Sequence, residues 1–213
     1  MSRLTNYQEY DFWKSLVDGE TTVKKLSKAL KKKNIGFKPL PGFIMEIDNT
    51  EYYRLQQHID CDEVYPGIII GNGSTAKQKR YLSEIGITHV LNAAEGNFSG
   101  YVNTNSEFYS DTNIKYLGFR LYDSPIVDIS KYFYPAANFI EDALSTTSGK
   151  VYVHCVMGVS RSATLVIAYL MIKRHMLAEE AIRLLRESRA IHPNHGFLEQ
   201  LATLDNQLRR NRL

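Results

Sequence analysis

Cys155 and Arg161, six positions apart, are the residues of this chain with the clearest potential for chemistry. Between them lie Val156, Met157, Gly158, Val159 and Ser160, and this loop joins the apolar run VYVH at 151–154 to a longer apolar run that begins near residue 162. A loop between a strand and a helix directs successive main-chain N–H groups inward and forms an anion cradle with the helix N-terminus. Arg161 adds a planar guanidinium that binds two oxygens of one phosphate. The same positive field favours a thiolate, so the pKa of Cys155 is expected below its ordinary value.

A thiolate beside an anion cradle predicts phosphoryl transfer. A tetrahedral phosphate held by the loop amides presents its phosphorus to Cys155, and attack by the sulfur gives a phosphocysteine. The oxygen that leaves needs a proton donor nearby. The segment LYDSPIVDIS at 121–130 offers two carboxylates, Asp123 and Asp128, and the position of Asp128 two residues before Ser130 suits a helix cap.

Apolar runs of strand length and helix length alternate along most of the chain, and they predict the elements that position this loop. Strands are expected at 64–70, 88–92, 115–120 and 151–154, and helices at 74–85, 130–144, 162–175, 178–189 and 196–209. This alternation predicts an α/β fold with a mostly parallel central sheet flanked by helices. Chemistry in such folds lies where strands end at their carboxyl side, which is the position of Cys155.

The first part of the chain differs in character from the rest. Residues 24–33 hold six lysines and no acid, and without them the net charge of +3 becomes −3, with 20 basic against 23 acidic residues. A nucleic-acid footprint over the whole surface is therefore disfavoured, and no nucleic-acid partner is expected. The apolar residues Val23, Leu26, Ala29 and Leu30 have helical spacing, and we interpret the lysines as a solvated helix face, with a grip on an acidic partner or a membrane surface as the alternative. A proline- and glycine-containing segment at 34–49 marks the boundary between a partly helical, lysine-rich N-terminal extension (1–57) and a catalytic domain (58–213).

Cysteine content and hydropathy suggest where the protein resides. With two cysteines in 213 residues and a polar start, the chain is expected in a reducing compartment, the cytoplasm, with the nucleus as a second location. The longest nearly apolar stretch, 163–172, is about half the length of a membrane span, so no span is expected. No cluster of histidine, cysteine and carboxylate residues has metal-ligand spacing, so neither a metal nor a cofactor is predicted. Cys61 is expected to be a bystander, with a resolving thiol for oxidised Cys155 as the alternative.

The run HCVMGVSRS at 154–162 matches the H-C-x-x-G-x-x-R-[ST] signature of cysteine-dependent phosphatases, and the wider chain resembles the VHR-like small atypical dual-specificity phosphatases. The segments that carry this resemblance are DEVYPGIIIGNGSTA (62–76), GITHVLNAAEG (86–96), YLGF (116–119), YF-x-x-AA-x-FI (132–140) and GFLEQL (196–201). The resemblance covers residues 58–212 and leaves out the first 57. It implies a protein tyrosine phosphatase-like fold, and phosphorylated proteins as partners, MAP-kinase-like proteins among them.

The family resemblance also implies roles for individual residues. Asp123 takes the place of the general acid, and Ser162 would ease departure of the thiolate in the second step. His154 and Asn194 take supporting positions around the loop. Arg189 matches an arginine that holds a second phosphate of the substrate, with an ordinary solvent-facing charge as the alternative.

The substrate is predicted from what the loop and the chain length provide. Met157 and Val159 are uncharged where lipid-directed relatives commonly carry lysine, which favours a phosphoprotein over an inositol phosphate. A catalytic part of this size leaves little room for the loops that deepen a tyrosine-only pocket, so hydrolysis of phosphotyrosine and of phosphoserine or phosphothreonine is expected. The alternatives are a phosphoprotein-binding pseudophosphatase or scaffold, and a phosphatase for non-protein phosphates. The oligomeric state is not indicated.

Overall fold

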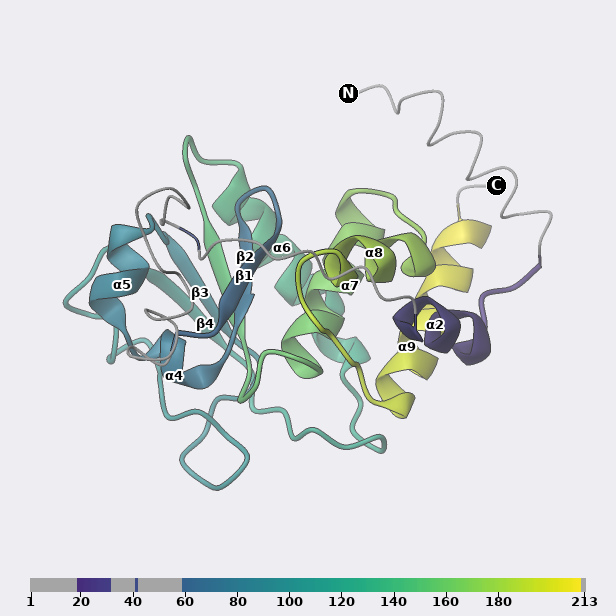
Figure 1. Ribbon diagram of the computed structural model, residues 1–213, viewed down its shortest axis with the longest axis horizontal. Coiled ribbons are helices and arrows are strands. Elements are labelled where there is room, and N and C mark those ends of the chain that lie inside the picture. The colour runs from purple at the N-terminus through teal and green to yellow at the C-terminus, as the bar shows by residue number, and fades with distance from the viewer. Residues whose placement is uncertain (1–18, 32–40, 42–58, 212–213) are drawn as a thin grey trace.

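A five-stranded sheet lies at the centre of the computed structural model, which describes residues 19–31, 41 and 59–211 (Figure 1). Its strands are β1 (Cys61–Tyr65), β2 (Ile68–Gly71), β3 (His89–Asn92), β4 (Lys115–Gly118) and β5 (Val151–His154), in the spatial order β1-β2-β5-β3-β4. β5 runs parallel to its neighbours β2 and β3, and β3 runs parallel to β4. Only β1 among these strands is antiparallel, to β2. The predicted α/β fold with a mostly parallel sheet is therefore confirmed.

The segment expected as one strand at 64–70 is instead a hairpin. β1 ends at Tyr65 and β2 begins at Ile68, with Pro66 and Gly67 in the turn. Gly67 has φ +79°, a conformation that residues with a Cβ rarely adopt. The reversal places Asp62 and its neighbours on an edge strand beside β2.

Helices cover both faces of the sheet (Figure 1). They are α4 (Gly73–Ala76), α5 (Lys79–Glu84), α6 (Phe133–Leu144), α7 (Arg161–Lys173), α8 (Ala178–Arg186) and α9 (His195–Arg210), with the 3-10 turn η1 (Ser130–Tyr132) before α6. In β2 the side chains of Ile68 and Ile70 belong to the larger core with α6 to α9, whereas Ile69 packs in the smaller core with α5. Successive strand residues point to opposite faces, which produces this division.

The single helix expected at 74–85 is two short helices, α4 and α5. The cap of α4 is Asn72, whose side chain accepts a hydrogen bond from the Thr75 N–H at 2.8 Å. The other helices follow the predicted ranges closely. α7 is buried along nearly its whole length, from Arg161 to Met171, as expected for a helix that is apolar on all sides.

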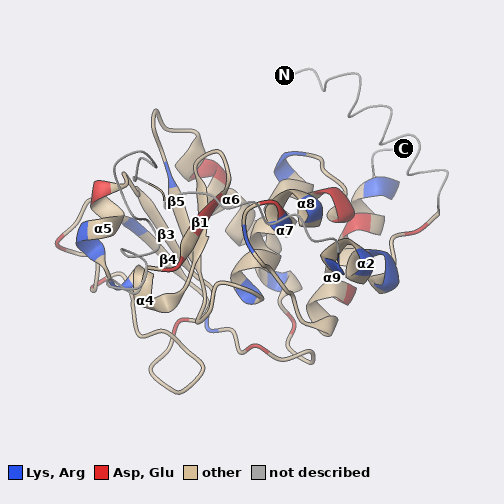
Figure 2. Ribbon diagram, viewed as in Figure 1, with Lys and Arg blue, Asp and Glu red and all other residues tan. Residues whose placement is uncertain are grey.

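The lysine-rich helix of the extension, α2 (Val23–Lys31), packs on α8 and α9. Leu26, Ala29 and Leu30 are buried in the larger core, together with residues of α6, α7, α8 and α9. Thr21 fixes the start of the helix, because its N–H donates to Asn206 Oδ1 at 2.8 Å and its hydroxyl donates to Asp205 Oδ2 at 2.5 Å. Figure 2 shows the basic residues gathered on α2. The apolar stripe is thus used for packing on the body, while the lysine face points outward.

Within the described part of the chain, no helix combines the length and the apolar character needed to cross a bilayer.

Candidate active site

The loop 155–160 leaves the carboxyl end of β5 and enters α7 at Arg161, as the sequence predicted. Gly158 has φ +67°, and a Cβ at this position would lie 2.3 Å from the carbonyl oxygen of Gly71 and 2.8 Å from Arg189 Nη2. Only glycine fits here. In this conformation the Gly158 N–H donates to Cys155 Sγ at 3.3 Å, so the loop curls around the sulfur.

The Cys155 thiol lies at the bottom of the loop with 1% of its surface exposed. Its Sγ is 3.4 Å from Ser162 Oγ, at the start of α7. Burial opposes ionisation of the thiol, but the hydrogen bond from Ser162, the charge of Arg161 and the N–H groups of Ser162 and Val159 outweigh it and lower the pKa of Cys155. These contacts favour the thiolate, which is the nucleophilic form of cysteine.

Arg161 is buried and anchored from outside the loop. Its Nη1 donates to the carbonyl oxygens of Gly100 and Leu121, both at 2.9 Å. Its Nε is buried and has no hydrogen-bond partner among the described residues. A buried donor on a charged group without a partner is rare and costly, so this N–H is placed for an anionic ligand.

Asp123 lies against the loop and faces Arg161. Its Oδ1 accepts hydrogen bonds from Ser160 Oγ at 2.9 Å and from Asn194 Nδ2 at 2.8 Å. Its Oδ2 is 3.6 Å from Arg161 Nε. The carboxyl group therefore forms an ion pair with the edge of Arg161 whose Nε has no hydrogen-bond partner among the described residues.

Asp128 occupies a different environment. Its Oδ1 accepts hydrogen bonds from the Ser130 hydroxyl at 2.6 Å and the Ser130 N–H at 3.0 Å. The Ser130 hydroxyl contributes most to the lowered pKa of Asp128. The exposed Asp128 side chain thus binds the first residue of η1, whose N-cap is Ile129, so Asp128 has a structural place at this helix start.

Asn194 connects the acid, the loop and α9. Its Oδ1 accepts the Phe197 N–H at 3.1 Å and caps α9, while its Nδ2 donates to Asp123. Its own N–H donates to Ser160 Oγ at 3.3 Å. One residue therefore fixes a helix start and orients a carboxyl group at the site.

His154 lies at the end of β5, completely buried. Its Nδ1 is 3.2 Å from the Cys155 carbonyl oxygen, which only accepts, so the proton is assigned to Nδ1. The pKa of His154 is lowered to about 4, mainly by burial; the hydrogen bond to the Cys155 carbonyl opposes this effect and the charge of Arg161 adds to it. The ring is neutral at pH 7 and supports the loop.

The rim of the loop is apolar. Met157 is exposed at 67% of its surface, and Val156 and Val159 are half-buried. Because these three side chains are apolar, the polar groups at the loop are its main-chain amides, the Ser160 hydroxyl and Arg161.

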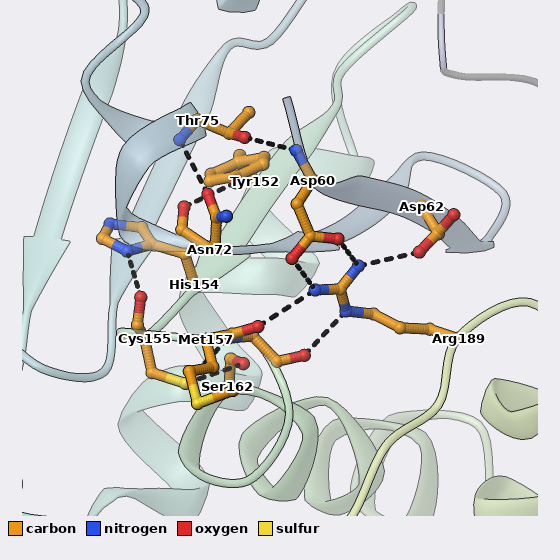
Figure 3. Close-up of polar contacts among 11 residues, drawn as sticks. Asp60, Asp62, Asn72, Thr75, Tyr152, His154, Cys155, Met157, Ser162 and Arg189 are labelled. Atoms are coloured by element: carbon orange, nitrogen blue, oxygen red, sulfur yellow. Dashed lines mark hydrogen bonds and ion pairs between the residues drawn. The ribbon is translucent and has the colours of Figure 1, made fainter. Parts of the chain in front are cut away.

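Arg189 lies behind the loop and not in front of it (Figure 3). All five of its N–H donors are used, in hydrogen bonds to the carboxylates of Asp60 and Asp62 and to the carbonyl oxygens of Met157 and Gly158. Its side chain is 6% exposed. This arrangement opposes both sequence-based readings of Arg189, since the guanidinium neither offers a donor to a second phosphate nor faces solvent.

Cys61 is on β1, with β2 between it and β5. It is fully buried, and burial raises the pKa of its thiol to about 12, opposed by the hydrogen bond with Tyr81. A thiol so strongly protonated and enclosed is unsuited to resolve an oxidised Cys155. In the part of the chain that the structure describes, no three histidine, cysteine or carboxylate side chains are grouped to hold a metal ion.

Several residues of the site were missed in the sequence. Gly100 and Leu121 contribute only carbonyl oxygens to Arg161, so their side chains give no signal. Gln200 on α9 holds the segment after Asp123, because its Oε1 accepts the N–H groups of Ile129 and Ser130 and its Nε2 donates to the Val127 carbonyl oxygen.

Comparison with known proteins agrees with this geometry. The family model described as "Dual specificity phosphatase, catalytic domain" matches residues 68–207. The chain is 49% identical over 149 residues to "Dual specificity protein phosphatase 13B" of Homo sapiens, across 70% of this chain and 74% of that protein. It is 48% identical over 166 residues to "Dual specificity protein phosphatase 26" of Homo sapiens, across 78% of this chain and 77% of that protein. A mouse putative dual specificity phosphatase, solved in complex with zinc tungstate, superposes with a TM-score of 0.61 at 26% identity and covers 71% of this chain and 90% of that one.

Proposed function

The chain belongs to the dual specificity phosphatase family, and from this premise we propose that it hydrolyses phosphoproteins in two steps with Cys155 as the nucleophile. Family membership makes it a cysteine-based, dual-specificity protein phosphatase. The mechanism proposed here assigns the individual steps to residues of this chain. The observation that carries it is the buried Nε of Arg161, which has no hydrogen-bond partner among the described residues and lies 3.6 Å from Asp123 Oδ2.

The substrate phosphate is bound before any bond changes. We assign its non-bridging oxygens to the main-chain N–H groups of residues 156–161 and to the Arg161 guanidinium. The anchoring of Arg161 through Nη1 keeps its Nε edge directed at this position. The complex of the mouse relative with tungstate, a tetrahedral oxyanion, is consistent with such a cradle.

In the first step the Cys155 thiolate forms a bond to phosphorus while the ester P–O bond breaks. Asp123, in its protonated form, gives its proton to the oxygen that leaves. The products are the phosphocysteine, the free hydroxyl of the substrate side chain and the Asp123 carboxylate. The Ser160 and Asn194 hydrogen bonds keep that carboxyl group at the loop.

In the second step water attacks the phosphocysteine. The Asp123 carboxylate takes one proton from the water, and the S–P bond breaks to release inorganic phosphate. The electron pair returns to the sulfur as a thiolate, which Ser162 Oγ stabilises from 3.4 Å. Both catalytic groups are thereby restored.

The substrates that we propose are phosphorylated proteins, with MAP-kinase-like proteins as the specific class to test, and the cytoplasm and nucleus as locations. The uncharged rim of Met157 and Val159 supports a phosphoprotein over a polyanionic inositol phosphate. The division into an extension at 1–57 and a catalytic domain at 58–213 stays a prediction. It is supported by the start of the family match at residue 68.

The test is turnover of phosphopeptides by the full chain. Peptides that carry phosphotyrosine, phosphothreonine or phosphoserine in one sequence context should all release phosphate, and a Cys155→Ser variant should release none while it still binds tungstate. Cys61→Ser is the matched control, since the Cys61 thiol is buried on β1 with β2 between it and β5, and this variant should keep its rate. A folded wild-type protein without turnover, or a Cys155→Ser variant with turnover, would contradict the mechanism.

A further inference from the structure

Arg189 contacts two successive carbonyl groups of the phosphate-binding loop from behind. Its Nη2 donates to the Met157 oxygen at 3.0 Å and its Nε donates to the Gly158 oxygen at 2.7 Å. Both carbonyls point away from Cys155 toward the guanidinium. Their orientation matters because each belongs to a peptide group whose N–H lies on the opposite side.

In a trans peptide the C=O and N–H bonds are antiparallel, so a group that fixes the carbonyl also fixes the amide. The Met157 carbonyl shares its peptide with the Gly158 N–H, which donates to Cys155 Sγ at 3.3 Å. The Gly158 carbonyl shares the next peptide with the Val159 N–H, a further donor that stabilises the Cys155 thiolate. Arg189 thus holds the outer end of both peptide groups whose inner ends face the sulfur.

The position of Arg189 is fixed in turn by two carboxylates from the start of the sheet (Figure 3). Asp60 accepts from Nη1 at 3.0 Å and from Nη2 at 2.9 Å, and Asp62 accepts from Nη1 at 2.7 Å. The backbone of Asp60 is itself held, because its N–H donates to Thr75 Oγ1 at 2.8 Å and its carbonyl accepts the Asn72 N–H at 3.0 Å. A guanidinium with every donor satisfied and nearly all its surface buried has one stable orientation.

We propose that Arg189, held by Asp60 and Asp62, is a positioning residue for the phosphatase reaction: it orients the two peptide groups between Met157 and Val159 so that their N–H bonds point at the sulfur of Cys155 and at the bound phosphate. The inference rests on the proposed function, since it concerns the same loop. It assigns a part in catalysis to Asp62 on the edge strand and to Asp60 just before it, although neither touches the substrate.

Other charged and titratable groups lie near Cys155 and Arg189, and they set the electrostatic surroundings in which Asp60 and Asp62 act. Arg161 and Ser162 on α7 favour the thiolate, and His154 on β5 is neutral at pH 7. Asp123, in the segment between β4 and η1, interacts with Arg161, whose Nε is 3.6 Å from Asp123 Oδ2. On the other side of the loop, Arg189 is accompanied by Asp60 and Asp62, with the protonated Cys61 and Tyr152 in its electrostatic surroundings.

The sign of one measurement separates positioning from simple charge. Removal of negative charge at Asp60 and Asp62 would, by Coulomb interaction alone, make the Cys155 thiol easier to ionise. Loss of orientation at the two peptide groups would make it harder to ionise, because hydrogen bonds to the thiolate weaken. Positioning therefore predicts that the double variant Asp60→Asn/Asp62→Asn raises the pKa of Cys155.

The experiment follows the rate of Cys155 alkylation by iodoacetamide against pH, with peptide mapping to identify the thiol, and the binding of tungstate. In the double variant we expect the alkylation midpoint to rise by about half a pH unit or more, which is a threefold change in thiolate population. Tungstate binding should weaken by about threefold to tenfold. Arg189→Lys should act in the same direction, because a lysine cannot bridge two carbonyls and two carboxylates.

A matched control is Glu141→Gln, which removes another partly buried ion pair, that of Arg174 with Glu141, whose closest atoms are 2.8 Å apart, away from the loop. It should lower the free energy of unfolding without a shift in the alkylation midpoint. The inference would be overturned if the wild-type protein turns over phosphopeptides and the alkylation midpoint of the double variant is unchanged or lowered. If the double variant fails to fold, Asp62→Asn alone gives the same readout with the same two outcomes. Absence of turnover in the wild-type protein would instead refute the proposed function.

Discussion

The Ser160 hydroxyl donates a hydrogen bond to Asp123 Oδ1 at 2.9 Å, so the phosphate-binding loop itself holds the carboxyl group that we assign as general acid. The two residues are 37 positions apart in the chain and come from different segments. This contact places the proton donor at the mouth of the loop before any substrate is bound. The conformation of the loop and the position of the acid are therefore linked by this hydrogen bond.

Asp123→Asn should lower kcat/KM for phosphopeptides by on the order of a hundredfold or more, because an amide cannot donate a proton to the leaving oxygen. In the wild-type protein the pH profile of kcat/KM should be bell-shaped, with a rise from ionisation of the nucleophile or the substrate and a fall from loss of the proton of the acid. The fall at high pH should flatten in this variant. Aryl phosphates with acidic phenols should be much less affected, since their leaving groups need little protonation. Asp128→Asn is the control and should keep both the rate and the profile. Full activity of Asp123→Asn on phosphopeptides would show that another group is the acid.

Asn194→Ser separates helix capping from acid placement. Serine caps a helix about as well as asparagine, so the stability of α9 should be kept. The shorter side chain does not reach Asp123, and kcat for phosphopeptides should fall by about tenfold through loss of this hydrogen bond. Steady-state kinetics beside thermal unfolding check the prediction. A fall in stability with an unchanged kcat would assign Asn194 to the helix alone.

Ser162→Ala should slow the second half of the reaction. Without the hydroxyl 3.4 Å from the sulfur, release of the thiolate from the phosphocysteine loses its hydrogen-bond donor. We expect kcat to fall by about tenfold to a hundredfold, with a burst of product in the first turnover. Rapid-quench measurement of that burst is the check, and wild-type protein is the reference. Equal steady-state rates and no burst would remove Ser162 from the mechanism.

The neutral, buried His154 makes the folded protein sensitive to acid. Its pKa falls from 6.5 to about 4 on folding, so the unfolded chain binds more protons than the folded protein below pH 6.5. Stability from this group is complete above pH 6.5 and is lost as the pH falls from 6.5 toward 4, by about 3 kcal/mol in total. Urea unfolding at pH 7 and at pH 4.5 measures the loss. His154→Gln should show a smaller loss between these pH values, and an equal loss would contradict the assignment.

Leu26→Ala tests whether the helix of the N-terminal extension stabilises the catalytic body. Leu26 is fully buried between α2 and the helices it packs on, so its truncation should lower the free energy of unfolding by about 2 to 4 kcal/mol. Denaturant unfolding of the full chain measures this. Lys28→Ala, on the exposed face of the same helix, should change the free energy by about 0.5 kcal/mol or less. Equal effects of the two substitutions would mean that α2 does not contribute to the core.

The sequence predicted the parts of the protein that depend on local pattern. The apolar strand at Val151–His154, the loop after it and the buried helix α7 all lie where the sequence placed them, because a short motif between two apolar runs leaves few alternatives. The hairpin of β1 and β2 was missed, since Pro66 and Gly67 interrupt a run that reads as one strand. In that case turn chemistry prevailed over hydrophobic pattern.

The contacts that adjust the site could not be predicted, since they join residues that are far apart in the chain. Arg189 is 129 positions from Asp60 and 127 from Asp62, and nothing in the local sequence of either segment indicates the partnership. The burial of α2 against the rest of the protein could not be predicted either. The spacing of Leu26, Ala29 and Leu30 indicated an apolar stripe, but only the tertiary structure reveals the helices that cover it.

The two oxygens that anchor Arg161 belong to the main chain of Gly100 and Leu121. Every amino acid carries such an oxygen, so the hydrogen bonds themselves require no particular side chain, although Leu121 is buried in the core and Gly100 has φ +84° with Tyr122 close to where a Cβ would lie. Substitutions at exposed neighbours such as Arg120 and Tyr122 can therefore change the surface that a protein target meets while the guanidinium keeps its orientation. The fold thereby separates the evolution of target choice from the preservation of its chemistry.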